Sequence, residues 1–269
     1  CRGRPSSRGN EGTGVPDIMT LWKALVALLA GFGGGVLNTL AGGGTNLTFP
    51  ALLWLGVDPV RASSTSTVCL WLGQALGALA YREQLRTTPR IWLLFSVPAL
   101  LGGWLGGWLL IQTPGEFFRG LVPYLVLGGS LLLAFEPWLR RRLPVGENQQ
   151  TRLVWRLGGG GVILAVSVYG GYYGAGMGFL MLAALGLLGV GSLQRANALK
   201  NLFGTLLNLA AIVFFLFVGA VVWELVGFMM LGAALGGYLG GRVASLIPEG
   251  PLRLLIVGLG LGVGVLLLL

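Results

Sequence analysis

The first apolar stretch of the sequence is long enough to cross a membrane, and it then breaks at a run of glycines. It reads LWKALVALLAGFGGGVLNTLAGGGTNLTFP, residues 21–50. About 20 apolar residues span the hydrocarbon core of a bilayer as a helix. Glycine is a poor helix former, so the run AGGGTN (41–46) favours an interruption. The stretch therefore predicts a membrane helix that is broken at a defined point.

The composition extends this prediction to the whole chain. Of the 269 residues 55% are hydrophobic and 10% are charged, whereas soluble domains carry about 25% charged residues. Comparable apolar runs occupy residues 91–111 and 121–139. We expect an all-α integral membrane protein, a polytopic bundle of about eight to ten membrane segments.

Two halves of the sequence resemble each other. LWLGVDPVRAS (53–63) aligns with LLGVGSLQRAN (187–197) if one residue is inserted, and each element precedes a span with polar residues. The sequence therefore predicts two homologous repeats, each starting with a glycine-broken helix or hairpin. The predicted organisation is a disordered tail (1–18), a first transmembrane repeat (19–138), a cytoplasmic basic linker (139–157) and a second repeat (158–269).

The distribution of arginine favours an inverted arrangement of the repeats. Loop 82–90 and linker 139–157 are arginine-rich and are expected in the cytoplasm, whereas residues 218–224, the counterpart of loop 82–90, contain no Lys or Arg. The cationic tail and Lys23 argue instead for a cytoplasmic N-terminus. Met19 is a candidate start of the native product.

The glycine breaks are candidate binding sites. Helices broken at equivalent positions of two repeats mark the substrate site of many transporters, although glycine also simply permits close helix packing. The second break lies in GGYYGAGMGF (170–179). Candidate binding residues at the breaks are Asn38, Thr45, Asn46 and Tyr173, with the broken-helix glycines Gly42, Gly43, Gly44, Gly174 and Gly176.

A polar stripe runs along one later span. Residues spaced i, i+4, i+7 and i+11 fall within about 60° on a helix, and Asn197, Asn201, Gly204 and Asn208 have this spacing. Lys200 lies beside the stripe. The equivalent residues in the first half are Ser63, Thr67, Leu70 and Gln74, with Ser66 at the position of Lys200.

Such stripes should avoid lipid, because a lysine at mid-bilayer costs about 2.5–3.5 kcal/mol. We expect the two stripes to face each other, a cavity or the broken loops. The candidate substrate-binding residues are Ser63, Thr67, Gln74, Asn197, Asn201 and Asn208, with Lys200 as counter-charge. Two alternatives are helix-to-helix hydrogen bonding by the amides and hydroxyls, and a Lys200 side chain that reaches the headgroups.

Other functional classes have little support in the residues. Histidine is absent and the two cysteines cannot build a metal site, so we expect no catalytic residues, no cofactor and no metal. An intramembrane enzyme would need Ser63 or Ser66 paired with Lys200. The net charge of +9 is expected to orient the protein in the bilayer rather than to bind nucleic acid. The expected partners are a small anionic substrate and lipid.

The broken segment with LGVDPVRAS and the second-half segment with ALKN (198–201) resemble the TauE/SafE sulfite-exporter family, nearest to its YfcA-like branch. The resemblance covers about residues 20–269. Residues 63–67 read SSTST where YfcA-like members tend to have an asparagine–lysine pair. The resemblance implies a multi-pass permease of the bacterial inner membrane for a small anion. We expect it to export sulfite, a sulfonate or a related organic acid by alternating access. An anion channel or a substrate-free scaffold stays the alternative.

Overall fold

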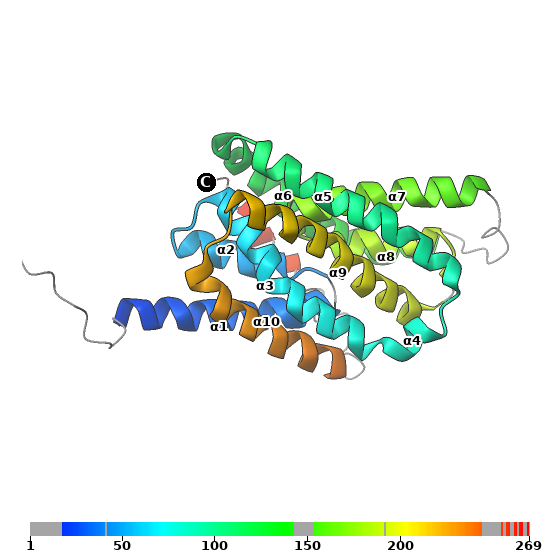
Figure 1. Ribbon diagram of the computed structural model, residues 1–269, viewed down its shortest axis with the longest axis horizontal. Coiled ribbons are helices and arrows are strands. Elements are labelled where there is room, and N and C mark those ends of the chain that lie inside the picture. Colours follow the sequence, from blue (N-terminus) through cyan, green and yellow to red (C-terminus); the bar gives the residue numbers. More distant parts are fainter. Residues whose placement is uncertain are drawn as a thin grey trace, which may run out of the picture.

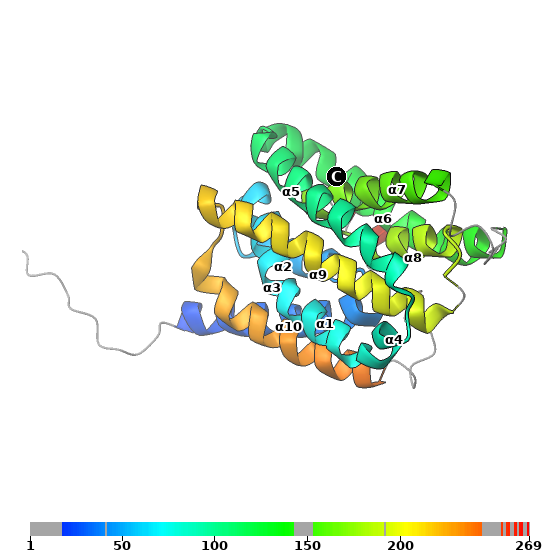
Figure 2. The ribbon, with the colours of Figure 1, turned by 45° about the vertical axis from the view of Figure 1, so that its right-hand side comes forward.

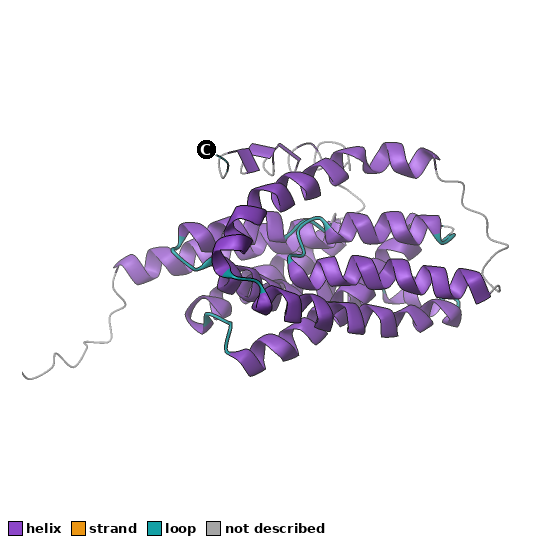
Figure 3. Ribbon diagram, turned by 90° about the horizontal axis from the view of Figure 1, so that it is seen from above, coloured by secondary structure: helices purple, strands orange, loops and turns teal. Residues whose placement is uncertain are grey.

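The computed structural model describes residues 18–40, 42–142, 153–190 and 192–243, together with eight positions between 254 and 268. These residues form helices and connecting loops without a strand (Figure 3). The helices in chain order are α1 (Ile18–Leu40), α2 (Thr45–Trp54), α3 (Pro59–Ala80), α4 (Arg82–Arg86), the 3₁₀ helix η1 (Arg90–Phe95), α5 (Ser96–Gln112), α6 (Gly115–Arg142), α7 (Leu153–Tyr172), α8 (Met177–Leu187), α9 (Leu193–Val218) and α10 (Trp223–Val243).

Four segments among the described residues are long and apolar enough to cross a membrane: Leu21–Thr39, Arg90–Gln112, Gln194–Val218 and Trp223–Gly240. The predicted all-helical membrane fold is therefore confirmed. The total of eight to ten segments stays a prediction. The expected tail 1–18 and the expected span 252–269 lie mostly outside the described residues.

Both predicted helix breaks are present. The first separates α1 from α2 and includes the described residues 42–44, and the second separates α7 from α8 at residues 173–176. The helices after the breaks have 10 and 11 residues, and at about 1.5 Å per residue each covers only about half of a bilayer. The chain therefore has two short helices whose first residues lie inside the protein.

The helix bounds differ from the expected basic linker 139–157. Helix α6 continues to Arg142 and α7 begins at Leu153, so the residues at both edges of that range are helical. Arginine favours the last turn of a helix because the negative end of the helix dipole attracts it. The arginines at 140–142 therefore extend α6 instead of ending it.

Local sequence explains how the two polar helices begin. At α3 the Asp58 side chain accepts a hydrogen bond from Val60 N at 3.0 Å, and Pro59 occupies the first turn. At α9 the Ser192 hydroxyl accepts from Arg195 N at 3.2 Å. Both are N-caps, which satisfy N–H groups that have no partner inside the helix.

The long helices pack across the two halves of the chain. Helix α1 packs most extensively against α10, and α5 against α7 (Figures 1 and 2). Helix α3 also packs against α10, and α5 against α9. The two polar helices α3 and α9 then contact each other between these groups.

Close helix contacts depend on glycine. A Cβ on Gly35 of α1 would collide with the backbone at Ala233 of α10, and a Cβ on Gly171 of α7 would collide with the backbone at Gly103 of α5. Backbones can approach this closely only where side chains are absent. Many of the described glycines thus lie where two helices cross.

Candidate functional site

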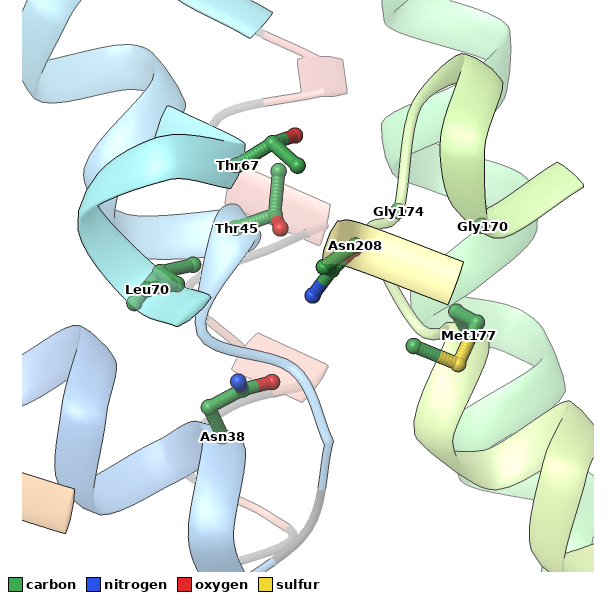
Figure 4. Close-up of a pocket in the computed structure, with 8 residues that line it drawn as sticks. All are labelled: Asn38, Thr45, Thr67, Leu70, Gly170, Gly174, Met177 and Asn208. Carbon is green, nitrogen blue, oxygen red and sulfur yellow. The ribbon is translucent and has the colours of Figure 1, made fainter. Parts of the chain in front are cut away.

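A small pocket lies where the two helix breaks meet (Figure 4). It receives residues from both broken helices and from both polar helices. The lining residues are Asn38, Thr45, Thr67, Leu70, Gly170, Gly174, Met177 and Asn208.

The two breaks touch each other directly. Gly178 N donates a hydrogen bond to Gly42 O at 3.3 Å. Gly42 has φ of +78°, a conformation that glycine adopts without strain. A Cβ on either residue would collide with the backbone of the other. The first residues of α2 and α8, Thr45 and Met177, consequently lie at the same pocket.

The polar part of the lining is neutral. Asn38, Thr45, Thr67 and Asn208 are each 6–7% exposed. Thr67 Oγ1 donates to Ser63 O of its own helix at 3.0 Å. Figure 4 shows the Asn38 amide at the end of α1 and Asn208 between the two breaks. Amides and hydroxyls of this kind can donate hydrogen bonds to an anion without adding charge.

The two polar stripes meet beside this pocket. Asn208 Nδ2 donates to Gln74 Oε1 at 2.7 Å, and Gly204 leaves the space that the Gln74 amide occupies, because a Cβ there would overlap it. Trp71 Nε1 also donates to Thr205 O at 3.2 Å. The stripes therefore face each other rather than lipid.

Several buried polar atoms close to these elements have no hydrogen-bond partner in the described part of the protein. Buried polar groups are nearly always paired, so each such atom calls for a ligand or a water molecule. The atoms from predicted site residues are Asn46 Nδ2 and Oδ1, Ser63 Oγ, Gln74 Nε2, Tyr173 Oη, Asn197 Oδ1, and Asn201 Nδ2 and Oδ1.

Lys200 is fully buried, and its Nζ donates to Thr39 O at 3.2 Å. Thr39 is the second-last residue of α1, whose final carbonyls have no partner within the helix. Gly42 N donates to Leu37 O and Asn38 O, and the Lys200 ammonium takes the next carbonyl. A cation here is stabilised by the negative end of the helix dipole.

This geometry corrects two interpretations of Lys200. The alternative in which its side chain reaches the headgroups is wrong, because the side chain ends against α1 in the interior. The serine–lysine pair is not formed either. Ser66 Oγ lies 2.5 Å from Thr48 Oγ1, Ser63 Oγ has no hydrogen-bond partner in the described residues, and Lys200 bonds to Thr39 O. Within the described residues no carboxylate pairs with Lys200.

The predicted site residues thus fall into two groups. Five line the pocket, namely Asn38, Thr45, Thr67, Gly174 and Asn208. The other predicted residues lie outside the lining, namely Asn46, Ser63, Gln74, Tyr173, Asn197, Lys200, Asn201, Gly42, Gly43, Gly44 and Gly176.

Sequence reasoning missed Thr39, Gly170 and Met177. Thr39 takes part through its backbone carbonyl, which carries no residue-specific signal. Its position just before the predicted break was the available indication, because a helix end supplies free carbonyls. Gly170 and Met177 resemble ordinary packing residues in an apolar segment.

Comparison with known proteins identifies the family. A family model described as sulfite exporter TauE/SafE matches residues 27–267. A probable membrane transporter protein of Haemophilus influenzae is 33% identical over 224 residues, 81% of this chain and 85% of that protein. The probable membrane transporter protein YfcA of Escherichia coli K12 is 31% identical over 225 residues, covering 82% and 77% of the two chains.

A probable membrane transporter protein, ORF9, of a Sinorhizobium species is 30% identical over 222 residues, covering 80% of this chain and 81% of that protein. The relatives are named as transporters, and none of the three names is that of an enzyme. The apolar helices and the family match together describe a transporter embedded in a membrane. The chain belongs to the sulfite exporter TauE/SafE family.

Proposed function

We propose that this transporter moves a small oxyanion, sulfite or a short sulfonate, out of the cell through the pocket at the two helix breaks. The observation that carries the proposal is the set of hydrogen-bond donors at the site. The polar lining consists of amides and hydroxyls, and the buried amino group of Lys200 lies at the adjacent end of α1. This arrangement favours an anion over a cation.

The two short helices add to the attraction for an anion. Their first residues, Thr45 and Met177, line the pocket. A helix N-terminus carries about half a positive charge, and it commonly binds anionic groups. Two such ends face the same small volume. Hydroxyl and amide donors would replace the hydration shell of the bound anion.

The family membership suggests where and how the protein works. We infer a multi-pass protein of the bacterial inner membrane, with two homologous inverted repeats. In support, helix, break, short helix, polar helix and glycine-rich helix follow in this order twice along the chain. In transporters built this way, alternating access exposes one central site to each side in turn.

An anion flux assay tests the function. Purified protein in liposomes is expected to give saturable flux of sulfite or methanesulfonate. Asn208→Leu removes the amide from the pocket at similar volume. It should raise the anion concentration for half-maximal flux about tenfold or more, because one buried hydrogen bond to a charged group contributes about 1.5–3 kcal/mol. Thr205→Val is the control on the same helix, since its hydroxyl bonds only to Asn201 O.

The outcomes separate the rival functions. Flux that rises linearly with concentration indicates a channel. Flux of neither anion contradicts the proposed substrates and leaves the scaffold alternative. Equal effects of Asn208→Leu and Thr205→Val would contradict the placement of the site in the pocket.

Gly204→Ala is expected to impair transport with little effect on stability. The new Cβ would displace the Gln74 amide and break its bond to Asn208. A flexible side chain can move away, and alanine favours the helix by about 1 kcal/mol, so the thermal unfolding temperature should hardly change. The flux should fall as much as in Gln74→Ala. The double variant Gly204→Ala/Gln74→Ala should transport no worse than either single variant, because both changes break the same Gln74–Asn208 bond. Additive losses of flux would contradict this common cause.

A further inference from the structure

The long helices form two bundles, and each bundle mixes the two halves of the chain. Bundle A consists of α1, α3 and α10, and bundle B of α5, α7 and α9, each a set of three mutually packed helices. In Figures 1 and 2 bundle A includes the blue and orange helices at the bottom, whereas α5 and α7 lie at the top. The short helix α2 packs with bundle A and α8 with bundle B.

Contacts within each bundle are at the level of the backbone. In bundle A, a Cβ on Gly73 of α3 would collide with the backbone of α10, and a Cβ on Gly237 of α10 would collide with the backbone of α3. In bundle B, Gly103 of α5 lies in the same way against Leu207 of α9. Interfaces this tight do not slide without separating the backbones, so each bundle should behave as one rigid body.

Contacts between the bundles are less extensive: α3 packs against α9, the two breaks touch at Gly42 and Gly178, and hydrogen bonds surround the pocket. The Lys200–Thr39, Gln74–Asn208 and Gly178–Gly42 bonds each join one bundle to the other. The pocket is shared equally, because four lining residues come from bundle A with α2 and four from bundle B with α8. A cavity between two rigid bodies opens when the bodies separate.

The chain passes from bundle B to bundle A at a point suited to a hinge. Gly219, which ends α9, has φ of +69° and open space around its Cβ position. The next residues are fixed to α3, because Ser64 Oγ donates to Ala220 O at 2.6 Å and Val222 N donates to Thr65 Oγ1 at 3.1 Å. In this connection rotation is therefore confined to Gly219, whereas the passage from α3 of bundle A to α5 of bundle B runs through α4 and η1.

We propose that the bodies that move in transport are bundles A and B, and not the two halves of the sequence, with the hydrogen bonds around the pocket and the α3–α9 contact holding the present state. The proposal rests on the proposed function, since it describes how that pocket opens. Movement of the sequence halves would instead pull α1 from α10 and α5 from α7, which breaks the most extensive helix contacts among the described residues.

Spin-label distances distinguish the two partitions. Labels are placed on exposed positions of four helices, at Leu29 (α1), Leu101 (α5), Val162 (α7) and Leu235 (α10), which are 60%, 55%, 41% and 58% exposed. Cys1 and Cys69 are replaced by alanine. The pairs 29–235 and 101–162 lie within bundles but join different halves. The pairs 29–101 and 162–235 lie within halves but join different bundles.

On addition of saturating sulfite or methanesulfonate, electron paramagnetic resonance should show altered distances for 29–101 and 162–235 and constant ones for 29–235 and 101–162. The opposite pattern overturns the proposal. Anion flux by the labelled proteins without any distance change also overturns it and leaves the proposed function intact.

Absence of flux would count against the proposed substrate alone. The proposal is then judged on the ligand-free protein, in which the pairs between bundles should have broader distance distributions than the pairs within them. Equal widths in that case overturn it.

Discussion

Replacing Gly178 by alanine is expected to destabilise the protein by at least about 2–3 kcal/mol and to abolish transport. The new Cβ would meet the backbone of Gly42 at the crossing of the two breaks. No flexible side chain is present there to move aside, and forcing extra atoms into a packed site costs about 1–3 kcal/mol or more. The bond from Gly178 N to Gly42 O would also be lost.

Alanine substitutions at three further glycines distinguish the cost of a steric collision from the cost of backbone strain. Gly42→Ala combines both, because φ is +78° and the space is filled, so it should be the most damaging. Gly56→Ala has φ of +86° but open space, and should cost about 1–2 kcal/mol from the left-handed conformation alone. Gly227→Ala has neither problem and should be neutral or slightly stabilising.

Thermal unfolding in detergent and anion flux in liposomes measure these effects. The expected order of stability is Gly227→Ala, Gly56→Ala, Gly178→Ala and last Gly42→Ala. If Gly178→Ala were as stable and active as Gly227→Ala, the direct contact of the two breaks would be contradicted.

Replacing Lys200 by methionine is expected to lower anion flux by about 30-fold or more without lowering stability. Loss of a buried counter-charge from an ionic site costs about 2 kcal/mol or more, and each 1.4 kcal/mol is a factor of ten. The fold gains little net stability from this charge, because the cost of burying an ion offsets the attraction of the α1 carbonyls, and no carboxylate pairs with Lys200 in the described structure. An apolar side chain of similar length should leave the unfolding temperature equal or higher.

Two variants give this prediction its controls. Lys200→Gln keeps an N–H donor for Thr39 O but removes the charge, so it should lose flux as Lys200→Met does. Lys23→Met removes an exposed lysine on α1 and should leave flux unchanged. Retained flux in Lys200→Met would contradict the role of the charge, and a marked fall in unfolding temperature would make Lys200 a structural residue instead.

The sequence predicted the broken helices and the meeting of the polar stripes for clear physical reasons. Glycine runs interrupt helices, and polar residues at helical spacing within an apolar span must turn away from lipid. The partners of individual helices could not be predicted in the same way. The face that joins α1 to α10 consists of Gly35 against Ala233, and small residues of this kind fit many helices equally well before the shapes are known.

The role of Lys200 was predictable only in part. A lysine in an apolar span with amides nearby indicates a functional position, and the structure places it beside the pocket. Its partner, Thr39 O, is a backbone atom whose availability depends on where α1 ends. The exchange of α5 and α10 between the bundles likewise has no signature in composition or periodicity.

The exchanged packing also has a consequence for biosynthesis. Helix α10 is synthesised long after α1 and α3, yet it covers the glycine faces of both. Helices α1, α2 and α3 can therefore pack together early, but the glycine faces of α1 and α3 stay uncovered until α10 has been synthesised. A nascent chain that stops before α10 would therefore expose the glycine faces of α1 and α3 and lack one of the three long helices of bundle A.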